Sequence, residues 1–520
     1  MACSFSREQR SYPSEALADK RPLACTSPPG QGESRAPVSA ALPETPTPPM
    51  SPEPPPSDVA RPHPPASPSL LARAALVVVA LLPAVIAVAQ LGRIHPDEVF
   101  QALEPAYWRV HGYGVLAWEW RDGIRNWAVP GVLAGFLKLA GMLGITDPQG
   151  YRAMTAVPQL ALHAWSLWAA YRFAARRTGV SGGWLAVLLV GLYGPVLVFA
   201  GRTLAESFST SFLVVAMEAL DRRERETRAG LLGGAALGLA VVTRYPSAIC
   251  VLTALLYLLV ARRWRMLAFT CLGGLVVAAG LGLLDHLTWG SPFHSFFTYV
   301  RFNVLSGEAA ARFGSAAPGF YLLPLLTAVP VWAWVAVPLA LRAGRRGVSL
   351  PLTCAAVYLG VLLVTAHKEE RFLYPALVLG VLAAAPVVAD LLTTRVPASA
   401  RWGVTAMALV TGLVSARWFP PQDLRADQFR AIVASTRMGG ATGLLIVNEG
   451  LWGSGGFFYL GQRIPWLTCD WPRDDAFQRG LRDRTFNRAV SFEDRALPEL
   501  QAGGFRIEKR IGRETLLVRD

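Results

Sequence analysis

Charged residues are scarce in this chain. Only 17% of its 520 residues are Asp, Glu, Lys or Arg, whereas 52% are hydrophobic. A soluble domain normally carries about 25% charged residues. The shortage argues against an ordinary soluble domain and favours a membrane protein.

Lysine, cysteine and the usual cofactor motifs are also rare or missing. Lysine supplies only four of the 50 basic residues, so arginine carries nearly all of the formal charge of +14. Of the six cysteines, three lie in apolar runs and two in the N-terminal tail, which leaves only Cys469 and argues against a disulfide scaffold. The sequence contains no CxxC pair, HExxH motif, Walker A motif or GxGxxG loop, so we expect neither a metal nor a cofactor.

Long apolar runs recur from Leu71 onward. About eleven of them are long enough to cross a hydrocarbon layer of ~30 Å as helices. Short basic turns separate alternate runs, and arginines in such turns belong on the cytoplasmic side of a membrane. This placement accounts for the net charge without a nucleic-acid partner. The arginines concerned are Arg172, Arg176, Arg177, Arg222, Arg223, Arg225, Arg228, Arg262, Arg263, Arg265, Arg342, Arg345, Arg346, Arg395 and Arg401.

These patterns divide the chain into three regions. Residues 1–70 show no apolar period, and 15 of the 42 residues from Ser27 to Pro68 are proline, so we predict a disordered cytoplasmic tail. Residues 71–417 hold the apolar runs. Residues 418–520 regain ordinary polarity and contain strand-like segments at 444–447, 505–511 and 514–519. This last region predicts a small α/β cap on the outer face.

The expected fold is therefore an all-α polytopic membrane protein with an outer cap. Two long outer loops are predicted, at 92–126 and 285–317. Residues 127–145 are predicted to form a juxtamembrane or re-entrant helix, because a full span there would place Arg176 and Arg177 outside. The predicted spans are 71–91, 151–171, 181–200, 203–220, 229–243, 246–261, 266–284, 318–341, 349–366, 373–392 and 402–416.

A first charged cluster, His95-Pro96-Asp97-Glu98-Val99-Phe100-Gln101, follows the first span. Proline suits the first position of a helix, and acids suit its positive end, so the segment could simply begin a helix. Capping needs only one acid, however, and favours Ser or Asp before the proline. We therefore interpret Asp97 or Glu98 as a carboxylate that the helix dipole keeps ionised, which is a candidate general base.

A second cluster, His367-Lys368-Glu369-Glu370-Arg371-Phe372-Leu373-Tyr374-Pro375, separates two apolar runs. One interpretation is a salt-bridged connector with snorkelling side chains, since charges are common at span ends. The sharper interpretation is an anion site in which Lys368 and Arg371 face a phosphate and His367 forms a hydrogen bond to it. This function requires the two clusters to meet around one outer pocket.

Other ionisable and aromatic residues lie at the outer ends of the predicted spans. Each charged residue alone is best explained as paired or snorkelling, but together they would line one cavity if the spans form a bundle. These residues are Arg202, Glu206, Arg244, Asp285, His286, His294 and Arg301. His163 is expected to be a hydrogen-bonded core histidine. The tryptophans around Trp118 fit an interfacial belt better than a sugar-stacking surface.

Ordered motifs from about residue 90 to 380 resemble glycosyltransferase family 22, the mannosyltransferases that use polyprenyl phosphate mannose. The matching motifs are the first cluster with Glu104, Gly112-Tyr113-Gly114, Trp118-Glu119-Trp120, Arg202-Thr203-Leu204, Asp285 with Trp289-Gly290, Phe302-Asn303-Val304 with Gly307, and the second cluster. The arginine-proline-threonine segment of the family is replaced here by Arg244-Tyr245-Pro246-Ser247.

This resemblance implies a GT-C fold and an inverting transfer of mannose from a polyprenyl (dolichyl-type) phosphate to a hydroxyl of a lipid-linked or GPI-like glycan. The residues suggest the same chemistry, because cations stabilise the charge that a departing phosphate gains. We assign Asp97 as base, Glu98 as its partner or as a group that orients the acceptor, and His367, Lys368, Arg371 and Arg301 as phosphate ligands. Supporting residues are His95, Gln101, Glu119, Trp120, Arg202, Arg244, Asp285, Asn303 and Tyr374.

Two alternatives stay open. A flippase or transporter of lipid-linked sugars would also bury charges at span ends, although no pair of interrupted helices suggests alternating access. A GT-C enzyme for another sugar, such as glucose or aminoarabinose, would share every pattern. The arginine-rich, alanine-rich composition favours a bacterial inner membrane with a periplasmic site, and a eukaryotic source would place the site in the lumen of the endoplasmic reticulum.

Overall fold

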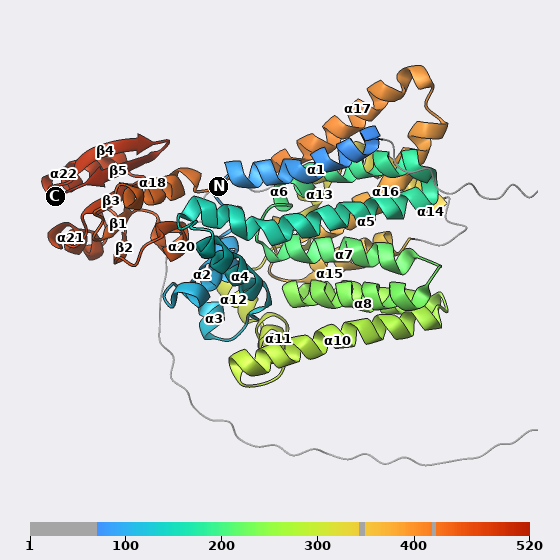
Figure 1. Ribbon diagram of the computed structural model, residues 1–520, viewed down its shortest axis with the longest axis horizontal. Helices are drawn as coiled ribbons and strands as arrows, with labels where there is room; N and C mark the ends of the chain where they lie inside the picture. Colours follow the sequence, from blue (N-terminus) through green and yellow to red (C-terminus); the bar gives the residue numbers. More distant parts are fainter. Residues whose placement is uncertain (1–69, 343–348, 419–422) are drawn as a thin grey trace, which may run out of the picture. The chain divides into compact units, whose positions relative to one another are not determined.

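Helices make up most of the described chain (Figure 1). The computed structural model describes residues 70–342, 349–418 and 423–520. The tail predicted for residues 1–70 lies outside these ranges except for Leu70, where α1 begins. The bundle consists of α1 (Leu70–Ala89), α5 (Pro148–Gly191), α6 (Gly194–Phe199), α7 (Ala205–Asp221), α8 (Glu226–Thr243), α9 (Ala248–Val260), α10 (Trp264–Trp289), α13 (Leu322–Ala328), α14 (Val331–Arg342), α15 (Leu350–Val364), α16 (Tyr374–Thr394) and α17 (Ala398–Val414).

Two helical segments are long and apolar enough to cross a membrane by length and composition. Within the described ranges these are Trp264–Trp289, which is α10, and Glu370–Thr394, which contains α16. The apolar helices α1, α4, α9, α13 and α15 are shorter. The number of about eleven spans therefore stays a prediction.

One predicted boundary is confirmed and one is wrong. The range of α5 contains two helices that meet at a kink at Gly179, where φ is 72°, and this kink lies between the expected spans 151–171 and 181–200. The predicted span 266–284 is too short, because α10 continues to Trp289 and includes Asp285. Polar residues end an apolar run in the sequence, but a buried carboxylate that accepts hydrogen bonds does not end the helix. The predicted outer loop 285–317 instead contains α11 (His294–Val300), η3 (Arg301–Leu305) and α12 (Glu308–Phe313).

Glycines allow α8 and α10 to pack backbone against backbone. A Cβ atom on Gly234 would lie 2.0 Å from the carbonyl oxygen of Thr270, and one on Gly273 would lie 2.3 Å from that of Leu231. Small residues at helix crossings in membranes permit such close approach. Figure 1 shows α5, α7, α8 and α10 following one another across the bundle.

The substitution Gly234→Ala should destabilise the bundle by about 1–3 kcal/mol, the usual result of overpacking. The obstacle is a backbone carbonyl, so no side chain can rotate to make room. Thermal unfolding of the purified protein in detergent would measure the loss. Gly280→Ala on α10 is the matched control, because nothing lies within 4 Å of its added Cβ. Equal melting temperatures for the two variants would contradict the packing argument.

Short helices gather at one end of the bundle (Figure 1). They are η1 (Glu98–Leu103), α2 (Glu104–His111), α3 (Trp118–Arg121), α4 (Ala128–Met142), α11, η3, α12 and η5 (Glu370–Leu373). The connection between α7 and α8, which carries Arg222, Arg223 and Arg225, lies at the opposite end. Both charged clusters of the sequence therefore lie at the end away from this arginine-rich turn.

The C-terminal region forms a five-stranded mixed sheet with the order β2-β1-β3-β5-β4. Strand β1 pairs in parallel with β2 and β3, and β5 pairs in antiparallel with β3 and β4. A turn at Gly512-Arg513 joins β4 and β5. The elements are α18 (Ala426–Arg437), β1 (Leu444–Val447), α19 (Gly450–Gly453), α20 (Gly456–Leu460), β2 (Trp466–Cys469), α21 (Asp475–Arg482), β3 (Arg488–Ser491), η7 (Asp494–Ala496), α22 (Leu497–Ala502), β4 (Arg506–Ile511) and β5 (Glu514–Val518).

Candidate active site

The two charged clusters of the sequence meet in the structure. Nη2 of Arg371 donates a hydrogen bond of 2.7 Å to Oδ2 of Asp97, although 274 positions separate the two residues. Asp97 immediately precedes η1, and Arg371 lies in η5 just before α16. The first outer segment and the segment before α16 thus share one set of charges.

Arg371 holds three carboxylates together. Besides Asp97, its Nε donates to Oε2 of Glu369 over 2.6 Å, and its Nη1 lies 3.2 Å from Oε1 of Glu206. Glu206, in α7, also accepts from Nη1 of Arg244 over 2.7 Å. Burial of such charges is tolerated only when they are paired and hydrogen-bonded. Three carboxylates and two guanidiniums therefore form one network, which two imidazoles extend.

The imidazoles belong to His95 and His367. His95 lies between the two clusters, with Nδ1 3.2 Å from Oδ1 of Asp97 and Nε2 3.5 Å from Oε2 of Glu369. Nε2 of His367 lies 3.1 Å from Oε1 of Glu369, and this hydrogen bond is the largest cause of the raised pKa of His367. The raised pKa favours the protonated, cationic form of the His367 imidazole beside Glu369.

Asp97 is an ionised and reachable carboxylate. Burial alone would raise its pKa, but the charges of Arg371 and His95 outweigh burial and hold the pKa of Asp97 well below its usual range. Its side chain is 21% exposed. An anion that competed for Arg371 would remove the main cause of this low pKa, so Asp97 would become a stronger base.

Glu98 has different surroundings. Its side chain is fully buried, accepts from Nη2 of Arg152 and from the backbone N–H of Ile94, and lies 3.7 Å from Nη1 of Arg202. Burial would raise its pKa, but the two arginines outweigh burial and lower it. Glu98 therefore anchors the start of η1 to the bundle, while Asp97 faces the network.

Several predicted supporting residues lie close to the network. Gln101 donates to Oε1 of Glu119 over 3.0 Å, and Oε2 of Glu119 is buried with no hydrogen-bond partner in the described part of the chain. Burial raises the pKa of Glu119, and the charge of Arg125 opposes this rise. Trp120 is buried beside Trp127 and donates its indole N–H to the carbonyl of Phe100. Together these contacts fix the loop after α2 against η1.

Other predicted site residues lie elsewhere. Tyr374 is buried in the bundle, where its ring stacks on that of Phe199 with centroids 4.2 Å apart. Arg202 donates to the carbonyl of Gly92, and Oδ2 of Asp285 accepts from the backbone N–H and hydroxyl of Ser295. Arg301 and Asn303 are exposed on η3.

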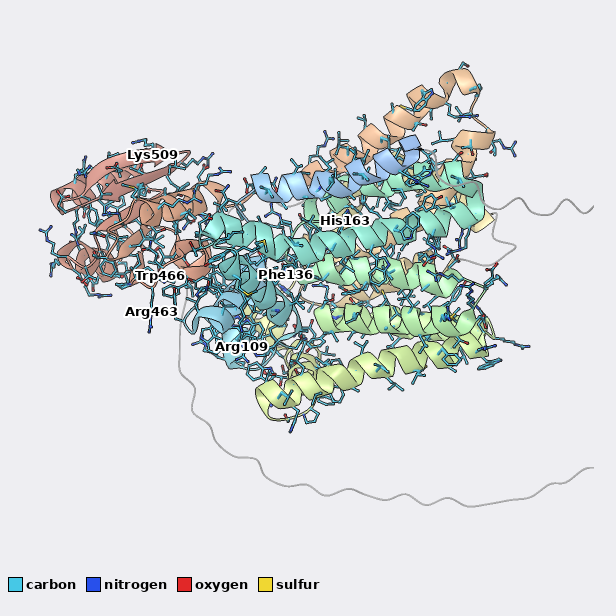
Figure 2. All side chains as sticks on the ribbon, in the orientation of Figure 1. Arg109, Phe136, His163, Arg463, Trp466 and Lys509 are labelled. Carbon is cyan, nitrogen blue, oxygen red and sulfur yellow. The ribbon has the colours of Figure 1, made fainter. Side chains whose placement is uncertain are left out.

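Lys368 and His163 have hydrogen-bonding surroundings that the sequence did not reveal. The ammonium of Lys368 donates to the backbone carbonyls of Ala316 and Thr365, so it joins two loops, and its role as a phosphate ligand stays a prediction. His163 lies in α5 inside the bundle (Figure 2). It is buried, as expected of a core histidine, and its Nε2 has no hydrogen-bond partner within the described part of the chain.

The sequence alone does not reveal roles for Glu369 and Arg152, and it gives Glu206 only a weak one. Each is an ionisable residue at the edge of an apolar segment, which is a signal of function or pairing in membrane proteins. The partners of Arg152 and Glu206 lie 38 to 165 positions away in the sequence, and that of Glu369 lies two positions away. Residue spacing alone therefore does not reveal these pairs. No group of three or more His, Cys, Asp or Glu side chains within the described ranges is arranged to hold a metal ion.

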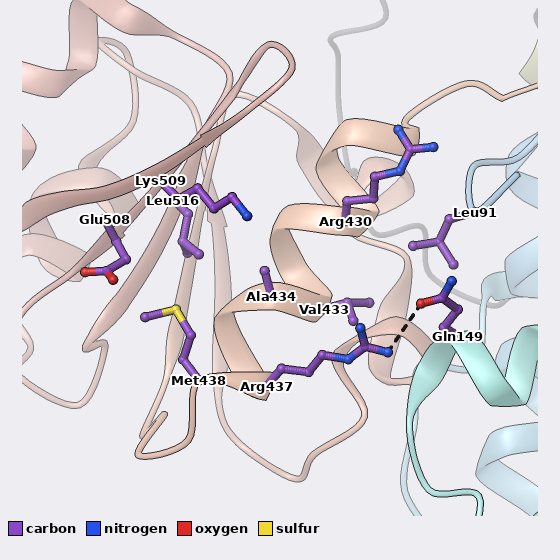
Figure 3. Close-up of a pocket in the computed structure, with 10 residues that line it drawn as sticks. All are labelled: Leu91, Gln149, Arg430, Val433, Ala434, Arg437, Met438, Glu508, Lys509 and Leu516. Atoms are coloured by element: carbon purple, nitrogen blue, oxygen red, sulfur yellow. Dashed lines mark hydrogen bonds between the residues drawn. The ribbon is translucent and has the colours of Figure 1, made fainter. Parts of the chain in front are cut away.

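A cavity of about 440 Å³ lies apart from this network, between the C-terminal sheet and the bundle. Figure 3 shows the residues that line it, which include Leu91, Gln149, Arg430, Arg437 and Lys509. None of its lining residues belongs to either charged cluster. Arg437 lines the cavity, and its Nη2 donates hydrogen bonds to Asp147 and Gln149.

Sequence comparison identifies related proteins. The sequence model of the Alg9-like mannosyltransferase family matches residues 75–420. The chain is 30% identical over 332 residues to GPI mannosyltransferase 3 of Yarrowia lipolytica, which is 62% of each protein. It is 25% identical over 351 residues to human GPI alpha-1,2-mannosyltransferase 3, covering 62% of this chain and 59% of that protein. The chain thus spans about three fifths of the length of these relatives.

Structure comparison finds a similar fold. The crystal structure of ArnT from Cupriavidus metallidurans bound to undecaprenyl phosphate matches with a TM-score of 0.55 and 14% sequence identity. The match covers 86% of this chain and 97% of that one. At this identity the similarity concerns the fold only. Because the match covers 86% of the chain, it includes residues outside the helical bundle.

Proposed function

The chain belongs to the Alg9-like mannosyltransferase family, and from this membership we propose that it moves mannose from a polyprenyl phosphate to a hydroxyl of a lipid-linked or GPI-like glycan. The observation that carries the proposal is the contact between Asp97 and Arg371. It puts a candidate base beside a candidate phosphate ligand. Such a pair is what a transfer from a sugar phosphate needs.

The proposed reaction is a single displacement at the anomeric carbon. Asp97 accepts the proton of the acceptor hydroxyl as its oxygen attacks, and the bond from the anomeric carbon to the phosphate oxygen breaks. The lipid leaves as a phosphate monoester with one more negative charge. Arg371 and His367 stabilise this charge, and the configuration of the sugar inverts.

Competition for Arg371 links donor binding to base strength. The guanidinium is shared among Asp97, Glu369 and Glu206. A donor phosphate draws the guanidinium towards itself, so Asp97 loses part of its counter-charge and its pKa rises. The base therefore becomes effective when the donor is in place. We expect no metal requirement, because the cations of the network supply the charge.

We place the site on the outer side of a membrane. The charged network lies at the bundle end opposite the arginine-rich turn between α7 and α8, and the positive-inside rule assigns such turns to the cytoplasm. The site would then face a bacterial periplasm or the lumen of the endoplasmic reticulum. The fold shared with ArnT, whose crystal structure contains undecaprenyl phosphate, supports a lipid phosphate as donor.

Transfer by the purified protein in lipid nanodiscs tests the proposal. The donors are polyprenyl phosphate mannose and the corresponding glucose and aminoarabinose lipids, offered with a panel of GPI-like and lipid-linked glycans. We expect a covalent mannosylated product that also forms in EDTA. Transfer of another sugar would support a different GT-C specificity. Movement of the lipid across a vesicle bilayer with no covalent product would support a flippase and overturn the proposal.

We propose that Lys368 also contacts the donor phosphate, so Lys368→Ala should weaken donor use, while loss of its hydrogen bonds to Ala316 and Thr365 should cost about 1–3 kcal/mol of stability. Loss of one charge-assisted contact to a phosphate is expected to raise the donor KM about 10-fold or more. Initial rates at varied donor concentration would measure the change. Lys138→Ala, at an exposed position of α4, is the control. Normal kinetics of the Lys368 variant would support a purely structural connector between the loops of Ala316 and Thr365.

A further inference from the structure

The segment that carries Asp97 is held by the C-terminal domain over much of its length. These two parts lie more than 300 positions apart in the sequence. Arg93 and Leu424 exchange both backbone hydrogen bonds, each of 2.9 Å. The other contacts are the hydrogen bonds from Gly92 to Asp423, from Arg93 to the carbonyl of Trp452 and from Tyr459 to the carbonyl of Leu91, and the edge-to-face pair of Phe100 and Trp452.

Glu104 makes the most unusual of these contacts. Its carboxylate is fully buried and accepts three backbone N–H groups, from Val115 over 2.8 Å, Phe457 over 2.9 Å and Phe458 over 2.8 Å. Val115 belongs to the loop after α2, whereas the two phenylalanines belong to α20. One carboxylate thus joins the outer loop, the Asp97 segment and the C-terminal domain.

No cation compensates this carboxylate within the described ranges. Burial raises the pKa of Glu104 to about 7, and the three backbone hydrogen bonds act against the rise. A buried carboxylate with no ion pair is costly, but an apolar side chain would leave three backbone N–H groups without an acceptor. What the carboxylate provides is a fixed geometry for three separate backbone segments.

The backbone of Gly456 lies close to the carboxylate of Glu104. Its φ is +67°, and an added Cβ would lie 2.5 Å from the carboxyl carbon of Glu104. Glycine is therefore required twice, for the left-handed backbone and for the close approach. Gly114, beside Val115, is also close, since a Cβ there would lie 3.3 Å from Oε1 of Glu104.

We propose that Glu104 is a positioning residue through which the C-terminal domain sets the place of Asp97 opposite Arg371, so that this domain is part of the catalytic unit. The inference rests on the proposed mannosyl transfer. Helices η1 and α2 follow one another without a break, from Glu98 to His111, and Asp97 directly precedes them. A shift at Glu104 therefore moves Asp97.

The outer loop is coupled to the same carboxylate. Val115 is bound to Glu104, and three residues later α3 begins, which places Glu119 against Gln101 of η1. Loss of the Glu104 contacts would thus loosen both sides of the candidate site. Misplacement of a reacting group by about 1 Å can cost about 10²-fold in rate.

The test compares Glu104→Gln and Gly456→Ala with wild type. An amide offers one acceptor oxygen instead of two, and the methyl group that Gly456→Ala adds would push the carboxylate away. For both variants we expect kcat to fall by up to about 10²-fold while the donor KM stays unchanged. Hydrogen exchange of the backbone amides from Asp97 to Glu104 should become faster in both.

Arg437→Gln is the matched control. Arg437 also joins the C-terminal domain to the bundle, with a hydrogen bond of 2.7 Å to Asp147, but this contact is exposed and involves neither Glu104 nor α20. We expect normal kcat and normal exchange at residues 97–104. A fall in kcat for this variant equal to that of Gly456→Ala would overturn the specific role of Glu104.

Two further outcomes separate this inference from the proposed function. If wild type transfers no mannose, the proposed function fails, and the exchange data still decide whether Glu104 positions the Asp97 segment. If wild type is active, and both variants keep wild-type kcat and wild-type exchange, the positioning role fails alone. A loss of activity that only matches the loss of folded protein, with kcat per folded molecule unchanged, also overturns it.

Discussion

Mannosyl transfer by the Asp97→Asn variant should be slower than wild type by about 10² to 10⁴-fold, the usual contribution of general-base catalysis. The amide keeps the size of the side chain and can still accept a hydrogen bond from Arg371. It cannot accept the proton of the acceptor hydroxyl. Initial rates at saturating donor and acceptor would measure the difference, because the loss is expected in kcat.

Folding should survive this substitution. Arg371 keeps its contacts with Glu369 and Glu206, so no buried charge is left alone. Asp122→Asn is the matched control, because Asp122 lies in the same outer loop and is exposed. Wild-type turnover by the Asp97 variant would remove Asp97 from the role of base.

The sequence predicted the local features of the site well. The cluster at Asp97 begins a helix, and the cluster at Arg371 separates α15 from α16. Both features, the helix start and the break between two apolar helices, follow from local residue preferences and from apolar runs, which can be identified in one sequence. Their contact required only that both clusters lie at the same end of the bundle.

Contacts between distant segments could not be predicted in this way. Glu98 and Asp97 are adjacent and chemically alike. Glu98 is nevertheless buried beside Arg152 and Arg202, whereas the side chain of Asp97 is partly exposed. The choice depends on which face of η1 packs against the bundle. Likewise, nothing near Glu104 in the sequence indicates Phe457, 353 positions later.

Helix ends were predicted least accurately where polar residues are buried. Asp285 was expected at the start of an outer loop, but it lies inside α10 and binds Ser295. A hydropathy pattern predicts that an apolar helix ends wherever a carboxylate occurs. A carboxylate that accepts hydrogen bonds from buried donors can lie inside the helix, and those donors are known only from the fold.

Removal of Arg371 should have the second large effect, on stability as well as on transfer. In Arg371→Ala, Asp97 and Glu369 lose their guanidinium partner, and Glu206 keeps only Arg244. Loss of one partner from a buried ion pair typically costs about 3–5 kcal/mol. We expect a clearly lower melting temperature in detergent and no detectable transfer.

Further variants separate charge from geometry at this position. Arg371→Lys keeps the charge but not the planar fork that reaches three carboxylates, so it should fold better than Arg371→Ala and still use the donor poorly. Adding Glu369→Gln to Arg371→Ala removes one unpaired acid and should recover part of the stability without recovering transfer. Arg430→Ala breaks only exposed pairs with Asp423 and Asp427 and should cost no more than about 1 kcal/mol. If Arg371→Ala melted like Arg430→Ala and kept the wild-type donor KM, Arg371 would neither hold the carboxylates nor bind the phosphate.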